Sequence, residues 1–237
     1  MFFFDPLYFI IMIPPLIFMF YAQAKVNSTF NKYSKQANSR RMSGREAAEV
    51  LLRANGLSNV RVETVKQKLG DHYDPTKKVL RLSPEVGDAP SVAALGIVAH
   101  EVGHAVQDKT GYAFMRLRSA IVPAANLGST FGYICVMLGF FIYMFSRSEF
   151  GVTVVLLGIF LFSLAVLFSL VTLPVEFNAS NRARAMLRSS GLLAAQENDA
   201  ASAVLSAAAL TYVAATLQAF AQLFYYIIMF LGMRNNK

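Results

Sequence analysis

The chain of 237 residues has one cysteine, Cys135, no tryptophan and three histidines. A single cysteine forms no intrachain disulfide and no C-x-x-C pair, which excludes a disulfide scaffold and a thiolate zinc knuckle. Charged residues make up only 15% of the chain, against about 25% in an ordinary soluble domain. With 55% apolar residues, this composition excludes a disordered chain and a typical cytosolic enzyme. The net charge of +8 therefore indicates loops at an anionic bilayer surface rather than a nucleic-acid partner.

Four long runs of the sequence contain no charged residue. They cover residues 6–24, 119–146, 150–175 and 200–233. A helix needs about 20 apolar residues to cross the hydrocarbon core, so each run is long enough to span it. The last run has an alternative, because its first half is rich in Ala, Ser and Thr and it also contains Gln218 and Gln222. It predicts either a fourth span, since small residues suit packing between membrane helices, or an amphipathic helix packed on protein.

The distribution of basic residues predicts the orientation in the membrane. In the first run the basic residues follow the apolar segment instead of preceding it, which favours an uncleaved anchor over a signal peptide. Between the first and second runs lie 16 of the 22 Lys and Arg residues. The positive-inside rule then places residues 25–118 and 176–199 in the cytoplasm and both chain termini outside.

The predicted cytoplasmic segment alternates helix and strand signals. Ser43 and Glu46 have the spacing of a capping box, in which each side chain satisfies a backbone N–H at the start of a helix. The strand at 79–83 is a candidate edge for an added substrate strand, although it could equally be an ordinary sheet strand. The expected elements are a helix at 44–55, strands around 60–65 and 77–83, a strand end and turn at 71–75, and a helix at 91–109.

Residues 100–104 read His-Glu-Val-Gly-His, an H-E-x-x-H motif within the last of these helices. His100 and His104 lie one turn apart on one helix face, so both imidazoles can reach a single Zn²⁺. Glu101 lies beside that face, where it can take a proton from water at the metal and pass it to a leaving amine. The 11 uncharged residues before His100 are too few to span a bilayer, which favours a site at the membrane surface.

A catalytic zinc needs a third protein ligand and an open position. The remaining histidine, His72, lies upstream, so we expect a distant carboxylate. Glu176 is favoured because it follows the third apolar run on the predicted cytoplasmic side. Ser180 shares its helix face and can hydrogen-bond a ligand imidazole from behind. The carboxylates after the motif are Asp108, Glu149, Glu176, Glu197 and Asp199.

Several separate motifs carry a family resemblance over nearly the whole chain. They are HEVGHA, the EFNAS segment at Glu176, DHYDPTKKVLRLSPEV from Asp71 and ALTYVAATL from Ala209. With these motifs the chain resembles the YugP family of bacterial membrane-bound neutral zinc metallopeptidases. More distantly it is similar to the HtpX and CAAX-prenyl-protease group of gluzincins, which usually has Asp where this chain has Ser180. The resemblance implies a zinc endopeptidase of the bacterial plasma membrane, with one Zn²⁺ per chain.

We therefore expect a mainly α membrane protein with about four transmembrane helices and a small α+β, zincin-like metalloprotease unit in the cytoplasm. The expected parts are an N-terminal anchor (1–24), a cytoplasmic α+β segment (25–118), a transmembrane hairpin (119–175), a cytoplasmic helix (176–199) and a final helix that forms the fourth span (200–237).

The group that stabilises a developing oxyanion is not fixed by any motif. Arg184 lies two turns beyond Glu176 on the same face, and the alternative for it is a positive-inside anchor. His72 and Tyr212 are further candidates, with a solvated turn residue and helix packing as their respective alternatives.

Three functions remain open from the sequence. The leading one is a zinc endopeptidase with a cytoplasm-facing cleft beside the bilayer, acting on a protein or peptide substrate. The others are an intramembrane protease and a non-catalytic scaffold in which zinc is structural. Contact with membrane lipid is expected in each, and small-residue faces at 128–139 and 200–221 are candidate surfaces for a homo-oligomer or another membrane protein.

Overall fold

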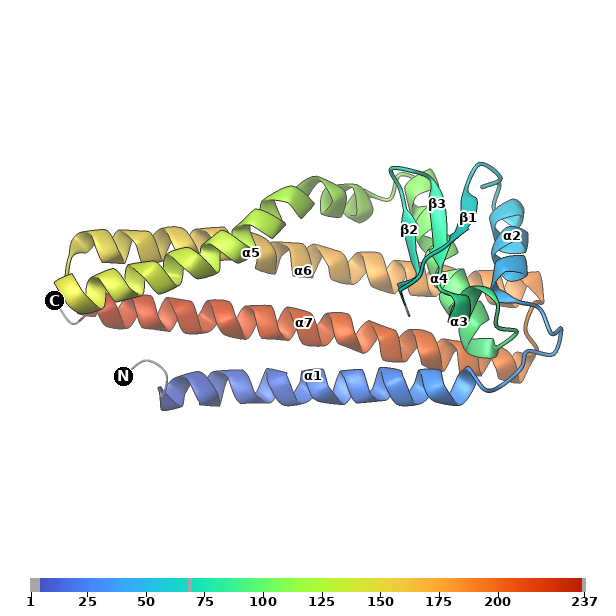
Figure 1. Cartoon of the computed structure of the whole chain (residues 1–237), viewed down its shortest axis with the longest axis horizontal. Helices are drawn as coiled ribbons and strands as arrows, with labels where there is room; N and C mark the ends of the chain where they lie inside the picture. The colour runs from blue at the N-terminus through green and yellow to red at the C-terminus, as the bar shows by residue number, and fades with distance from the viewer. Residues whose placement is uncertain (1–4, 68–69, 236–237) are drawn as a thin grey trace. The chain divides into compact units, whose positions relative to one another are not determined.

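The computed structural model describes residues 5–67 and 70–235. The chain divides into two compact units, each built from separate stretches of sequence (Figure 1). The first contains Met1–Tyr21, Leu117–Leu173 and Tyr212–Lys237, and the second contains Ala22–Arg116 and Pro174–Thr211. The helices are α1 (Pro6–Tyr33), α2 (Gly44–Ala54), α3 (Pro84–Gly87), α4 (Val92–Lys109), α5 (Ala113–Ser146), α6 (Glu149–Ser190) and α7 (Ala195–Asn235).

Among the described residues, the four helices α1, α5, α6 and α7 are long and apolar enough to cross a membrane. They contain the four charge-free runs, and the last run lies within the single 41-residue helix α7. The prediction of a mainly α membrane protein with a small α+β unit is therefore confirmed.

Helices α5 and α6 pack closely within the first unit, where they lie side by side (Figure 1). A Cβ atom at Gly132 would lie 2.7 Å from the backbone nitrogen of Phe162, and one at Gly158 would lie 2.6 Å from that of Val136. Only glycine fits these two positions, so the backbones of the hairpin can approach as small-residue faces allow in membranes.

The second unit contains a sheet of three strands, β1 (Arg61–Thr64), β2 (His72–Asp74) and β3 (Val79–Leu82), in the order β1-β3-β2. Strand β3 pairs in parallel with β1 and antiparallel with β2. Residues 72–74 form a strand that is followed directly by a turn, as expected, and this strand makes a hairpin with β3. One expectation is wrong here: strand β3 lies in the centre of the sheet, so it exposes no edge to a substrate.

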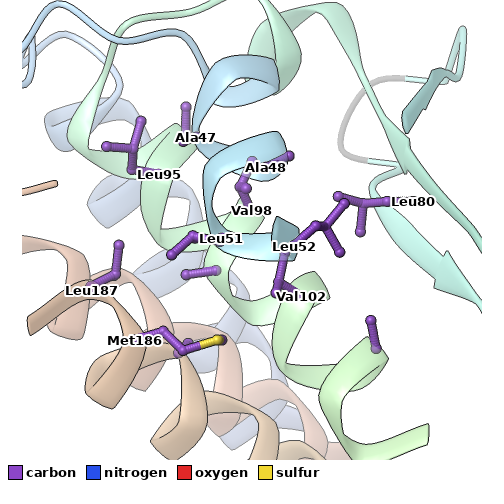
Figure 2. Close-up of a cluster of buried hydrophobic side chains, with 14 of the residues drawn as sticks. Ala47, Ala48, Leu51, Leu52, Leu80, Leu95, Val98, Val102, Met186 and Leu187 are labelled. Carbon is purple, nitrogen blue, oxygen red and sulfur yellow. The ribbon is translucent and has the colours of Figure 1, made fainter. Parts of the chain in front are cut away.

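The core of the second unit surrounds α4. The capping box at Ser43 and Glu46 is present and begins α2. Leu51 of α2, Val98 and Val102 of α4 and Leu187 of α6 point into one buried apolar cluster, whose side chains Figure 2 shows. Because α4 is buried along most of its length, its side chains are held rigidly, as close-packed interiors require.

Candidate metal centre

Helix α4 presents His100 and His104 one turn apart, and Glu176 of α6 lies opposite them. One carboxylate oxygen of Glu176, Oε2, lies 3.2 Å from Nε2 of His100 and 3.5 Å from Nε2 of His104. The two imidazole rings are nearly perpendicular, at 85°. In the described part of the chain, these three side chains are the group whose ligand atoms could hold one metal ion.

The spacing of these three atoms fits zinc. Tetrahedral coordination with bonds of about 2.0–2.1 Å places neighbouring ligand atoms about 3.4 Å apart. The observed separations of 3.2 and 3.5 Å match that value. Two imidazoles and one carboxylate are also the donor set of catalytic zinc sites, which leave one position for water or substrate. The Glu176 side chain is buried, with 3% exposed, whereas the side chains of His100 and His104 remain 14% and 11% exposed.

Each of the two imidazoles makes a hydrogen bond through Nδ1, the ring nitrogen that faces away from Glu176. Ser180 Oγ lies 3.2 Å from Nδ1 of His100, which is the contact expected from the sequence. Nδ1 of His104 lies 2.9 Å from Oε1 of Gln107, a fully buried residue that sequence reasoning missed. Its position three residues after His104, on the same side of the helix, is the signal that could have found it. With both Nδ1 atoms engaged, both Nε2 atoms face Glu176, where a metal ion could be held.

Small residues let α4 and α6 approach at the site. A Cβ atom at Gly103, between the two histidines, would lie 2.7 Å from the carbonyl oxygen of Ala179. Ala179 itself is fully buried. The small side chain at Ala179 and the glycine at 103 together allow this close approach. The contact brings α6 close to α4 between the two histidines.

Glu101 is also buried, and its Oε2 accepts a hydrogen bond of 3.0 Å from the backbone N–H of Tyr73. Burial raises the pKa of Glu101 above its ordinary value, although the N–H of Tyr73 acts in the opposite direction. A carboxylate with a raised pKa is a stronger base at neutral pH. Within the described residues, Oε1 has no hydrogen-bond partner, so one oxygen is held in place and the other is available.

The strand that holds Glu101 is itself fastened to α4. The Tyr73 hydroxyl donates to Oδ2 of Asp108 at 2.6 Å, and Lys78 pairs with the same carboxylate. Asp108, which was considered as a metal ligand, is therefore occupied in tying the β2–β3 hairpin to the helix.

We predict that Tyr73→Phe loosens this hairpin. A hydrogen bond to a charged group stabilises by about 1.5–3 kcal/mol, so loss of this one should raise backbone hydrogen exchange in β2 and β3 by at least about tenfold. Exchange mass spectrometry measures this directly, with α2 as the internal reference. Asp108→Asn keeps an acceptor oxygen for the hydroxyl but removes the charge that pairs with Lys78, so it should raise exchange as well. Unchanged exchange in Tyr73→Phe would show that the contact contributes no stability.

Two of the three oxyanion candidates, His72 and Arg184, make hydrogen bonds to other residues of the second unit. The ring of His72 lies 2.8 Å from the Gly70 carbonyl oxygen and 3.2 Å from a guanidinium nitrogen of Arg81. Arg184 donates to Asn181 and to Ser206, both at 2.9 Å. None of these described contacts reaches the two histidines or Glu176. Tyr212 belongs to the first compact unit, and its role stays a prediction.

Two histidines of an H-E-x-x-H helix, a glutamate from a distant helix and a second glutamate beside them define a zinc metallopeptidase type of site. The comparisons with known proteins agree with this class. The chain belongs to the family described as "Putative neutral zinc metallopeptidase", whose model matches residues 8–231. It is 42% identical over 231 residues to a Bacillus subtilis protein named "Putative membrane protease YugP", with 98% of this chain and 100% of that protein covered. No solved structure matches the chain.

Proposed function

We propose that the protein is a membrane-bound zinc endopeptidase, in which His100, His104 and Glu176 hold one Zn²⁺ per chain. The observation that carries this proposal is that both Nε2 atoms approach one oxygen of Glu176 at the spacing of zinc ligands. The hydrogen bonds behind both rings support it, because they leave the Nε2 atoms facing the metal position.

Each group of the site has a part in peptide hydrolysis. Zinc, when bound, supplies a Lewis acid that polarises the scissile carbonyl and makes water acidic near neutral pH. Glu101 accepts the proton of the attacking water on its available oxygen and delivers it to the leaving amine nitrogen. The N–H of Tyr73 keeps the carboxylate in place during both transfers.

The site is proposed to act at the cytoplasmic surface of the membrane. Glu176 directly follows the uncharged run 150–175, and basic residues flank that end of the run. Proteins in the membrane or close to it are therefore the expected substrates. The intramembrane alternative would require ligands at hydrocarbon depth, whereas α4 ends in Asp108 and Lys109. A structural zinc would require a fourth protein ligand, and the described residues supply three at this place.

Zinc content and peptide cleavage of the purified protein test the proposal together. We expect one zinc per chain, cleavage of an unstructured reporter protein, loss of cleavage on treatment with a chelator, and recovery on addition of Zn²⁺. Cleavage that persists in zinc-free protein would contradict the proposal. Zinc bound at full stoichiometry without turnover of any membrane or soluble substrate would favour the scaffold alternative.

The membrane orientation needs a separate measurement. In a Cys135→Ser background, the substitution Arg116→Cys provides a single thiol. A thiol reagent that cannot cross the plasma membrane should label it only after the cells are opened. Reaction in intact cells would place this segment outside.

A further inference from the structure

Gln107 connects the metal centre to the opposite helix through all parts of its side-chain amide. Its Oε1 lies 2.9 Å from Nδ1 of His104. Its Nε2 donates to the carbonyl oxygen of Val175 at 2.7 Å and to Oδ1 of Asn178 at 3.0 Å. The same Oδ1 accepts a hydrogen bond of 2.7 Å from Nε of Arg182. The contacts form one chain from Arg182 through Asn178 and Gln107 to His104.

The donor and acceptor groups of these residues determine which way each hydrogen bond in this series runs. A guanidinium group only donates, so Asn178 must present its oxygen to Arg182 and, with it, to Gln107. A backbone carbonyl only accepts, so the amide nitrogen of Gln107 must face Val175. The reversed amide would set two oxygens against each other at 2.7 Å. The amide oxygen of Gln107 therefore faces His104.

This direction determines the tautomer of the neutral histidine. An amide oxygen only accepts, so Nδ1 of His104 carries the proton and Nε2 keeps its lone pair. That is the form in which Nε2 can bind a metal. His100 differs, because its Nδ1 faces the hydroxyl of Ser180, which can donate or accept and so imposes neither tautomer.

We propose that Gln107, Asn178 and Arg182 are positioning residues that hold His104 in the tautomer and ring orientation required for zinc. This inference rests on the proposed zinc site. Asn178 and Arg182 lie on α6 with Glu176, so the helix that supplies the third ligand also prepares the second. Because Gln107 is fully buried, nothing from solvent can replace its contacts.

Zinc affinity and the protonation of the imidazole nitrogens test the proposal, since neither measurement needs peptidase activity. The chain has three histidines, so selective ¹⁵N labelling resolves them, and long-range ¹H–¹⁵N spectra of the zinc-loaded protein report which nitrogen carries hydrogen. Competition with a chelator gives the zinc Kd. In the wild type we expect the proton of His104 on Nδ1.

Gln107→Leu should weaken zinc binding by about 10- to 100-fold, as loss of a group behind a ligand histidine does, and should shift the His104 signals. Asn178→Ala should cause a smaller loss in the same direction. Asn178→Asp keeps an oxygen for both donors and should stay within about twofold of the wild type. Gln196→Leu is the control, because it makes the same substitution at an exposed residue that takes no part in these hydrogen bonds.

The outcomes separate this proposal from the proposed function. If the wild type binds zinc and both Gln107→Leu and Asn178→Ala match its affinity and spectrum, the positioning role is wrong while the zinc site stands. If Gln107→Leu does not fold, Asn178→Ala and Asn178→Asp decide, because equal affinities in the two would contradict the proposal. A wild-type chain without zinc affinity would overturn both.

Discussion

Glu101→Gln should lower the rate of peptide cleavage by about 10²- to 10⁴-fold, the usual contribution of a positioned general base. The substitution keeps the size of the side chain, and the amide oxygen can still accept the hydrogen bond from Tyr73. What is lost is the ability to take a proton from water. Because Glu101 is not among the three clustered residues proposed to hold zinc, zinc content should remain at one per chain.

The measurement is kcat and KM for wild type and variant at equal zinc content. Glu85→Gln is the matched control, because that carboxylate is exposed in the same compact unit; its kinetics should equal those of the wild type. Full activity in Glu101→Gln would exclude the role as base. Loss of zinc together with activity would instead assign Glu101 a part in holding the metal.

Gly103→Ala should disrupt the site although it adds a single methyl group. That methyl would lie 2.7 Å from the carbonyl oxygen and 3.3 Å from Cα of Ala179, and backbone atoms cannot turn aside. Helices α4 and α6 must then separate at the level of the ligands. We expect a loss of about 1–3 kcal/mol in the free energy of unfolding, and a fall of about 100-fold in cleavage rate, since a displacement of about 1 Å has that effect.

Gly96→Ala is the matched control on the same helix. A Cβ atom there would lie 3.5 Å from the nearest atom, the Cβ of Ala201, which is an ordinary contact. The same change should therefore be neutral, or stabilise the helix by up to about 1 kcal/mol. Thermal unfolding and zinc Kd of the two variants give the comparison. Similar behaviour of both variants would show that helix propensity, rather than the approach of α6, decides the outcome.

Local patterns predicted the parts of this structure that depend on neighbours in sequence. The capping box at Ser43 and the one-turn spacing of His100 and His104 need only helix geometry, so both could be read directly. Glu176 was reached by a different route, because the charge-free runs and basic residues restricted which carboxylates could lie on one side of a membrane.

The features that were missed depend on pairing between distant segments. The position of β3 between β1 and β2 follows from strand pairing across the sheet, which no local periodicity encodes. The position of Gln107 three residues after His104 indicates only its contact with that ring, because its other contacts are to a carbonyl of Val175 and a side chain of Asn178 about 70 residues away. Buried polar contacts of this kind can be recognised only when the three-dimensional positions of both residues are known.

The distance of Glu176 from the histidine pair along the chain has a consequence for biosynthesis. Glu176 lies 76 residues after His100 in the sequence, and the intervening segment includes α5 and the apolar part of α6. A nascent chain whose synthesis has just passed the H-E-x-x-H helix still lacks the proposed third ligand. On the proposed chemistry, the incompletely synthesised protein is inactive. It can hydrolyse peptides only after two further helices have been synthesised and inserted into the membrane.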